Sequence, residues 1–482
     1  MNDLSSLNPT PAVAPEHEYR IDGNTETDTP TITPLRQYPD DERSLQVHSV
    51  HQDTNVLIER HRLQAPPSYR GPTDHLVFTS GNDDDRIHLY QTDHLVIDIN
   101  ERRYHLDLAS DTQVIVLRTQ AGDDRIRVDD AVKTTVFIDS AEGNDLVVAG
   151  GGFTKVNAGS GNDRIFTRSG ASYVEAGAGD DLVRALGSGA ITAYGGQGRD
   201  TLIGGKGSCF LDGGQGDDLL QGGTGHSVLS GSDGDDHLVS GAARTTAYTG
   251  TGTDIVDDLR PDVRLFNAYS AAETAPSSRL EDPGVIIAAK DLDSCGVVVE
   301  GSAQFQERVN DDLRLLLGSE NGRQLLDALG QARERSGIPV VVRELSEEEN
   351  GMCVPNHPGQ DYPFIENGQA APPSDGCQVY YDPSFLKGEV TSIVHLYHEL
   401  CHAYNYVTGT MFPGMSADGI DGDRPRHAIP NLELQAVGLN IQGASFPFAG
   451  HPDPLSSNPE AFSENGLRRE FGIPPRKQYR ED

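Results

Sequence analysis

A Gly-x-Asp tripeptide recurs every 18 or 19 residues through the middle of the chain, and this repeat constrains the fold more than any other feature. Each copy is soon followed by Ile, Leu or Val. A fixed period of this length indicates a solenoid in which every coil stacks on the one before it. Because 18 is twice nine, each coil has room for two short strands and two tight turns. The copies begin at Gly143, Gly161, Gly179, Gly198, Gly216, Gly234 and Gly252, with looser ones at Gly81 and Gly122.

The repeats resemble the glycine-rich nonapeptide repeats of RTX proteins, most clearly over Gly213–Leu220. The resemblance implies a parallel β-roll with Ca²⁺ in its turns. Aspartates at this spacing stack along one edge, where they repel unless a hard cation lies between them. The alternate half-coils lack the Asp, so we expect calcium at one edge only. The alternative is a metal-free solenoid in which Asp and Asn shape the turns. The expected calcium residues are Asp145, Asp163, Asp181, Asp200, Asp218, Asp236 and Asp254.

A different composition begins near residue 300. The apolar pattern predicts helices over 310–317 and 322–335 and strands over 340–342 and 379–381, which together indicate an α+β domain. The first 70 residues are rich in Pro and lack a sustained apolar period, so we expect them to be disordered. The sequence therefore predicts a multidomain chain: a disordered export or leader region (1–72), a β-roll or β-solenoid (73–258), a connector (259–300) and an α+β domain (301–482).

The charge balance narrows the range of partners. The 482 residues include 74 acidic and 38 basic ones, for a net charge of −36. Such acidity disfavours nucleic acid and anionic membranes, because their phosphates would be repelled. No apolar run is long enough to span a membrane, and Met1–Glu16 lacks the basic start and apolar stretch of a standard secretory signal peptide. Five scattered cysteines do not form a disulfide framework, although Cys353 and Cys377 flank one loop and could pair.

A His-Glu-x-x-His motif lies in an apolar helix predicted over Thr391–Tyr404, after the candidate edge strand at 379–381. His398 and His402 are four residues apart, so they share one helix face and can bind one Zn²⁺. Glu399 stands next to the first ligand, where it can act as the general base of a peptidase. The alternative is an ordinary amphipathic helix with two surface histidines.

A catalytic zinc expects a third protein ligand. The metzincin extension is absent, because Asn405 replaces its Gly and Thr408 replaces its third His. We favour Glu433, which lies at the start of the next apolar helix. His427 and Asp423 are its competitors.

The C-terminal part also resembles the NleD-like zinc metallopeptidases, which are type III secretion effectors of bacterial pathogens. The resemblance implies a zincin-type endopeptidase that is secreted, is delivered into the host cytoplasm and cleaves a host protein, such as a stress-activated signalling kinase. The matching segments are Tyr380–Pro383, His398–Ala403, Glu433–Leu439, Ser463–Arg468 and Arg476–Tyr479.

Arg476 and Tyr479 have the spacing of an Arg-Tyr pair in clostridial neurotoxin light chains, a related zincin group. That likeness implies that they stabilise the oxyanion of the tetrahedral intermediate. The alternative is a solvated basic segment. We expect His395, one turn before the motif, to support the site or to pack, and Cys401 to pack in the core.

Three other functions are compatible with parts of this sequence. One is a calcium-binding interaction or adhesion protein whose C-terminal domain is not catalytic. Another is a type I secreted RTX protease, although those enzymes carry the repeats after the protease and are metzincins. The third is a β-solenoid that acts on polysaccharide, but the repeats offer no carboxylate cluster outside their turns.

Overall fold

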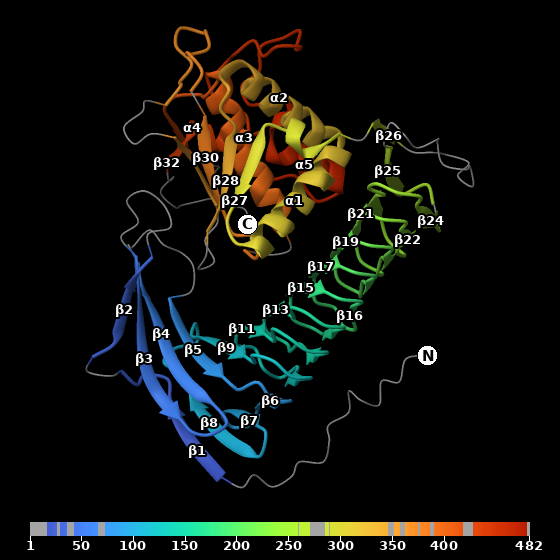
Figure 1. Ribbon diagram of the computed structural model, residues 1–482. Coiled ribbons are helices and arrows are strands. Elements are labelled where there is room, and N and C mark those ends of the chain that lie inside the picture. The colour runs from blue at the N-terminus through green and yellow to red at the C-terminus, as the bar shows by residue number, and fades with distance from the viewer. Residues whose placement is uncertain are drawn as a thin grey trace. The chain divides into compact units, whose positions relative to one another are not determined.

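The chain folds into two compact units, one built mainly from the repeats and one from the C-terminal region. The first contains Asp40–Thr245 with Thr253–Asp262 and the N-terminal strands, and the second contains Val263–Asp482 with Thr246–Gly252. No helix in the described part of the chain combines the length and apolar character needed to cross a bilayer. The computed structural model (Figure 1) describes residues 17–26, 29–35, 43–65, 73–258, 260–269, 285–288, 290–345, 351–356, 362–374, 376–385, 390–417 and 428–479.

The repeats form the predicted parallel β-solenoid, in which two long sheets run along the stack of coils. Its first sheet has the order β1 (His17–Asp22), β8 (Arg102–Asp107), β7 (Leu95–Ile99), β6 (Arg86–Gln91), β10 (Arg125–Val128), β12 (Leu146–Val148), β14 (Arg164–Thr167), β16 (Leu182–Ala185), β18 (Thr201–Ile203), β20 (Leu219–Gln221), β22 (His237–Val239) and β24 (Ile255–Asp257).

The second sheet runs through the other half of every coil. Its order is β2 (Thr31–Pro34), β3 (Ser44–Gln52), β4 (Leu57–Gln64), β5 (Asp74–Thr79), β9 (Val114–Arg118), β11 (Val136–Asp139), β13 (Thr154–Asn157), β15 (Ser172–Ala178), β17 (Ile191–Gln197), β19 (Cys209–Gln215), β21 (Ser227–Asp233), β23 (Thr245–Tyr248), β25 (Val263–Tyr269) and β26 (Val285–Ala288).

The apolar residue of each repeat fills the narrow core, as the sequence predicts. Ile165 pairs in register with Val147 on one side and Val183 on the other, and all three side chains are fully buried. One residue type at one position of every coil therefore produces a continuous apolar ladder.

The glycine of the repeat is required by the turn it makes. Gly161 has a φ of 130°, and a Cβ there would lie 1.9 Å from the carbonyl oxygen of Gly143 in the preceding coil. Any larger residue would push neighbouring coils apart, which explains why glycine recurs with the period of the coil.

The N-terminal region differs from the expectation of disorder. Strands β1 to β4 lie within the range expected to be a leader, and β3, β4 and β5 pair as antiparallel neighbours. Ile58 and Leu63 of β4 are buried. Pro34 stands at the end of β2, so it does not interrupt a ladder. Residues 1–16, 27–28, 36–42 and 66–72 lie outside the described part.

The second unit contains a mixed four-stranded sheet with the order β27 (Val297–Glu300), β28 (Val340–Glu344), β30 (Cys377–Tyr381) and β29 (Met352–Pro355). The first three strands are parallel, and β29 is antiparallel to β30. The strand at 379–381, expected at the edge, is therefore interior, because β28 pairs with one side of β30 and β29 with the other.

Helices surround this sheet, and α1 and α2 connect β27 with β28. Ser302 and Ser319 cap these two helices by accepting hydrogen bonds from Phe305 and Gly322 backbone amides. The helices in this unit are α1 (Ala303–Gly318), α2 (Glu320–Ser336), α3 (Ser392–Thr408), α4 (Asn431–Val437) and α5 (Glu464–Phe471), with short 3₁₀ turns at Leu292–Ser294 and Glu460–Phe462 and a small hairpin of β31 (Met415–Ala417) and β32 (Ala428–Pro430).

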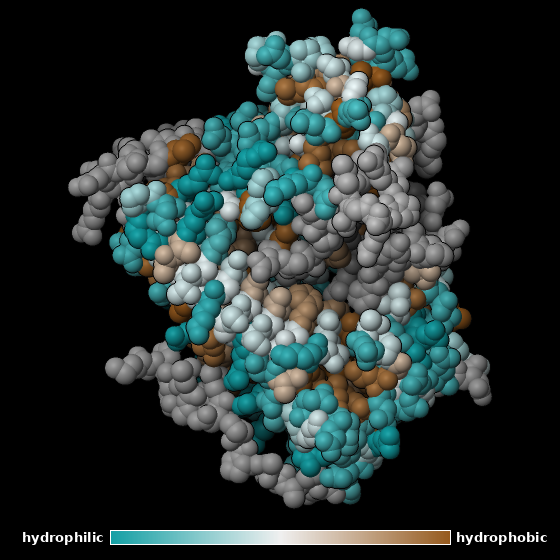
Figure 2. Space-filling model, turned by 180° about the vertical axis from the view of Figure 1, so that it is seen from behind, coloured by the Kyte–Doolittle hydropathy of each residue, from teal (hydrophilic) through white to brown (hydrophobic). Residues whose placement is uncertain are grey.

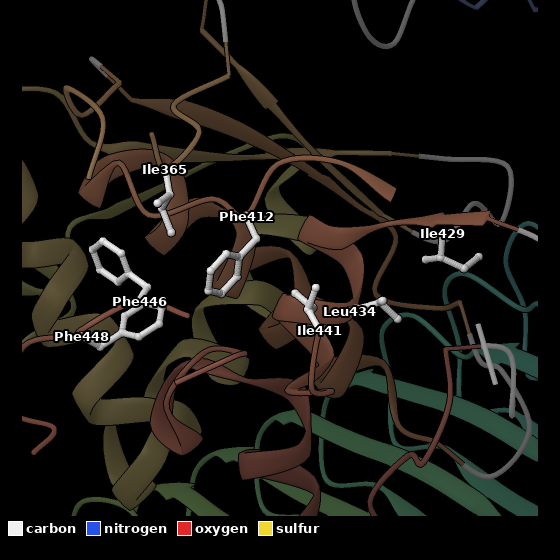
Figure 3. Packing of buried hydrophobic residues seen from close by; sticks show 7 residues of the cluster. All are labelled: Ile365, Phe412, Ile429, Leu434, Ile441, Phe446 and Phe448. Carbon is white, nitrogen blue, oxygen red and sulfur yellow. The ribbon is translucent and has the colours of Figure 1, made fainter. Parts of the chain in front are cut away.

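An aromatic and aliphatic cluster holds α4 in place (Figure 3). Leu434 of α4 belongs to this cluster, and Tyr479 packs against its margin. The cluster therefore fixes two segments that come from different parts of the chain. Its buried members are Ile365, Phe412, Ile429, Leu434, Ile441, Phe446 and Phe448.

Hydrophilic residues predominate on the face drawn in Figure 2, and hydrophobic residues gather there in smaller groups. This matches the large excess of acidic over basic residues.

Candidate metal sites

The His-Glu-x-x-His motif lies on α3, as predicted, and α3 is buried over most of its length. Thr391 is its N-cap residue, although its side chain makes no capping hydrogen bond. The helical spacing brings the Nε2 atoms of His398 and His402 to 3.1 Å from each other. Both imidazoles are buried, so few water molecules can compete for these nitrogens.

Glu433 comes to the same point from the first turn of α4. Its Oε2 lies 3.4 Å from the Nε2 of His398 and 3.4 Å from that of His402. Ligands held about 2.0–2.1 Å from a tetrahedral zinc are roughly 3.4 Å apart, so these separations suit one ion. The donor set of two imidazoles and a carboxylate also suits zinc. The structure thus brings together the three residues that the sequence analysis selected as metal ligands.

The charges in this cluster depend on each other. Burial lowers the pKa of His398, but hydrogen bonds with Glu433 and Glu464 outweigh it and raise that pKa to about 10. Burial likewise raises the pKa of Glu433, but the charge of His402 and the histidine hydrogen bonds hold it well below its usual range. Without a metal, the site therefore favours a positive charge, and a proton on His398 supplies it.

Glu399 lies beside the ligands in a buried position. Burial raises its pKa, which moves this carboxyl group towards the range of a general base. The backbone next to β29 forms the wall against it: a Cβ on Gly351 would lie 3.0 Å from the Glu399 Cγ. A small residue at 351 therefore leaves room for the glutamate.

Arg476 and Tyr479 lie close to each other but make different contacts. The Tyr479 hydroxyl donates a 2.9 Å hydrogen bond to the Oε2 of Glu433, so it reaches the metal-binding atoms. The Arg476 guanidinium lies 5.1 Å from the centre of the Tyr479 ring and donates to Glu464 at 3.2 Å. Tyr479 is thus placed at the candidate site, whereas Arg476 contacts it through a second carboxylate.

Sequence reasoning missed Glu464. The matching tail segment included it, but no spacing rule connects it with a histidine 66 residues earlier, and no role was assigned to it. In the structure its Oε2 lies 3.0 Å from the Nδ1 of His398.

The other residues singled out in the sequence lie away from the converging ligand atoms or outside the described part of the chain. His427 and Asp423 lie outside the described residues. His395 packs its ring against Phe385 and is not among the converging ligand atoms. Cys401 is fully buried, as expected for a packing residue. The five thiols are all free in the structure, including those of Cys353 and Cys377.

The repeated aspartates line one side of the solenoid, and those from Asp145 to Asp236 are buried. Each side chain accepts, through Oδ1, a hydrogen bond from the backbone amide of the equivalent residue in the preceding coil; Asp163 does so from Asp145 at 2.7 Å, and Asp181 from Asp163 at 2.7 Å. Turn shaping is therefore one function of this row. The same contact continues through Asp200, Asp218, Asp236 and Asp254.

The second carboxylate oxygen in this row has no hydrogen-bond partner among the described residues. This holds for the buried Oδ2 atoms of Asp145, Asp163, Asp181, Asp200, Asp218 and Asp236. A buried carboxylate oxygen without a donor is costly unless a proton or a cation satisfies it. These oxygens therefore fit Ca²⁺, which prefers oxygen ligands.

Burial raises the pKa along the row, and the charge of neighbouring aspartates adds to that effect. The pKa of Asp145 rises to about 6, that of Asp181 to about 7 and that of Asp236 to about 8. Around neutral pH, protons and calcium ions would therefore compete for the same oxygens.

Family models match both parts of the chain. Residues 293–479 match the effector protein family Peptidase_M91. The RTX calcium-binding nonapeptide repeat matches residues 157–189, 192–211 and 212–247. No curated protein and no solved structure matches the chain significantly. The C-terminal unit thus carries a Peptidase_M91 effector domain, and the solenoid carries RTX calcium-binding repeats.

Proposed function

We propose that this chain, with its Peptidase_M91 effector domain, is a zinc-dependent endopeptidase that is secreted, delivered into a host cell and active on a host protein there. The observation that carries the proposal is the convergence of His398, His402 and Glu433 within 4.8 Å, on a buried helix that also presents Glu399. The resemblance to NleD-like enzymes suggests a signalling kinase as the first substrate to test.

The three converging residues would hold the zinc ion. When bound, zinc supplies a Lewis acid that polarises the scissile carbonyl and acidifies a water molecule. Glu399 accepts a proton from the attacking water on its carboxylate and then donates it to the nitrogen of the leaving amine. Burial raises the pKa of Glu399, which favours its holding the proton between the two transfers.

Tyr479 completes this set of groups. In the metal-free protein its hydroxyl donates to Glu433. We propose that the hydroxyl donates instead to the carbonyl oxygen of the substrate as negative charge develops there. Arg476, which the sequence analysis paired with Tyr479 in this role, contacts Glu464, so we propose a supporting role for it.

The test is a comparison of new protein N-termini in host cells that express wild-type protein or Glu399→Gln. We expect one or a few cleavage sites with the wild type only, because the variant keeps the zinc ligands but loses the base. Glu334→Gln, which changes an exposed carboxylate on α2, is the matched control and should cleave like the wild type. Equal cleavage by Glu399→Gln would contradict the proposal, and absence of zinc from the purified wild type would contradict the metal assignment.

A second function, calcium binding by the solenoid, rests on a separate observation. Buried Oδ2 atoms without partners recur in successive coils, and the segment matches the calcium-binding repeat. We propose that Ca²⁺ binds along this row. If the C-terminal unit held no zinc and cleaved nothing, calcium-dependent interaction would become the principal function.

A further inference from the structure

We propose that Glu464 is a positioning residue that fixes the ring of His398 for the metal, and that Arg468 and Arg476 hold Glu464 in place. The inference rests on the proposed function, since it assigns a role next to the same metal site. It also gives Arg476 a different role from the oxyanion contact that its sequence spacing suggested.

The contact geometry supports this role. Glu464 is the first residue of α5, and its side chain is 4% exposed. Its Oε2 lies 3.0 Å from the Nδ1 of His398, on the opposite side of the ring from the Nε2 that faces Glu433 and His402. A carboxylate in this position determines both the orientation of the ring and which nitrogen carries the hydrogen.

Two arginines keep this carboxylate in place. Arg468, one turn later on α5, donates to Oε1 at 3.0 Å, and Arg476 donates to Oε2 at 3.2 Å. Both guanidinium side chains are nearly as buried as the glutamate. A buried carboxylate between two arginines remains ionised and can only accept hydrogen bonds. The hydrogen must then lie on the His398 Nδ1, which leaves the Nε2 lone pair for the metal.

The other histidine lacks such a partner. The Nδ1 of His402 is buried and makes no hydrogen bond with the described residues. The two histidines on α3 therefore differ: α5 holds the Nδ1 of His398, whereas no described residue holds the Nδ1 of His402. We therefore expect zinc affinity to depend on the contact between Glu464 and His398.

The experiment measures zinc affinity by competition with a chelator, using the full-length protein. Glu464→Gln should weaken zinc binding by about 10–100-fold, as is typical when the hydrogen-bond partner of a ligand histidine is lost. The absorption spectrum of the Co²⁺-substituted variant should also change, because the imidazole is no longer held in one orientation. Glu460→Gln is the matched control: this exposed carboxylate pairs with Arg469, so its loss should leave affinity and spectrum unchanged.

A second variant keeps the test decisive if Glu464→Gln does not fold. Arg476→Met keeps Glu464 and Arg468 but removes one hydrogen bond to the carboxylate, and it should weaken zinc binding by a smaller factor. If wild type binds zinc and both folded variants bind it as tightly with an unchanged Co²⁺ spectrum, the positioning role is wrong although the proposed function survives. If wild type binds no zinc, the proposed function itself fails. If Glu464→Gln does not fold, the affinity and spectrum of Arg476→Met decide.

Discussion

The Tyr479 hydroxyl contacts Glu433, one of the proposed metal ligands. It donates to Glu433 across 46 residues of sequence and packs against the cluster that holds α4. Tyr479→Phe should lower kcat about 100-fold or more while the zinc content at saturation stays that of wild type. Steady-state kinetics and metal analysis check this. Unchanged kcat would move oxyanion stabilisation to another group.

Glu433 supplies the carboxylate of the candidate metal site. Glu433→Ala should reduce zinc affinity by more than about 100-fold, because it removes the carboxylate ligand and leaves two histidines. Metal analysis after dialysis measures the loss. Glu366→Ala removes an exposed carboxylate and serves as the control. Full zinc retention by Glu433→Ala would return the third ligand to the loop before α4.

The sequence predicted which candidate ligands would come together better than it predicted the residues that contact them. His398 and His402 follow from helical periodicity, and Glu433 from its place at the start of an apolar helix. Glu464 could not be found this way, because its contact with His398 depends on how α5 packs against α3. The same limit applies to Arg476, whose spacing to Tyr479 is local but whose partner is set by the tertiary fold.

At the level of elements, the repeat period was sufficient to predict the solenoid, since each coil is stabilised by an identical neighbour. The N-terminal strands were missed because their apolar residues are few and separated by prolines and charges. The position of β29 was also missed, because strand order in a sheet is decided by long-range pairing.

Gly161 tests the turn that the repeat depends on. Gly161→Ala should destabilise the solenoid by more than about 1 kcal/mol, since φ is positive and the new Cβ would meet a backbone oxygen. Gly81→Ala is the matched control, because nothing lies within 4 Å of its Cβ position. Thermal unfolding monitored by circular dichroism checks the difference. Equal melting temperatures of the Gly161→Ala and Gly81→Ala proteins would show that the turn accommodates a Cβ without loss of stability.

The aspartate row should make stability depend on pH and calcium. In Asp181 the pKa rises from its ordinary value of 3.8 to about 7, so the folded state holds a proton that the unfolded state loses. Without calcium, the contribution of this row to stability is therefore greatest below about pH 4 and falls as the pH rises towards about 8. Millimolar Ca²⁺ should then raise the melting temperature more at pH 8 than at pH 5, and Mg²⁺ should raise it less.

Scans with chelator, Ca²⁺ or Mg²⁺ at the two pH values measure this effect. An unchanged melting temperature in all conditions would leave the row with its turn-shaping hydrogen bonds alone.

At the scale of the whole chain, the repeat residues Thr246–Gly252 belong to the second unit. Tyr248 is buried and donates a 2.8 Å hydrogen bond to Glu470 of α5, and the same carboxylate accepts hydrogen bonds from the backbone amides of Glu320 and Asn321 at the start of α2. The end of the repeats therefore contributes to the framework of the peptidase unit, although the family match begins only at residue 293.

Tyr248→Phe should therefore destabilise the second unit by about 1–3 kcal/mol, since a buried carboxylate loses a donor. Tyr90→Phe is a control in the first unit, where the hydroxyl makes only long contacts of 3.4 and 3.5 Å with Asp98. Chemical denaturation followed by loss of zinc binding reports on the second unit. A Tyr248→Phe protein as stable as wild type would show that this contact is incidental.

Because α5 lies near the end of the described chain, its contacts can form only late in synthesis. Coils of the solenoid can assemble during synthesis, because each meets a neighbour made only 18 residues earlier. The candidate metal site forms later, because its contacts join distant parts of the chain. His398 contacts Glu464, which lies 66 residues later, and Tyr248 contacts Glu470, which lies 222 residues later. Until α5 emerges, the nascent chain carries its two histidines without their anchoring carboxylate. If the proposed function holds, the metal site is therefore completed only after the repeats have been made.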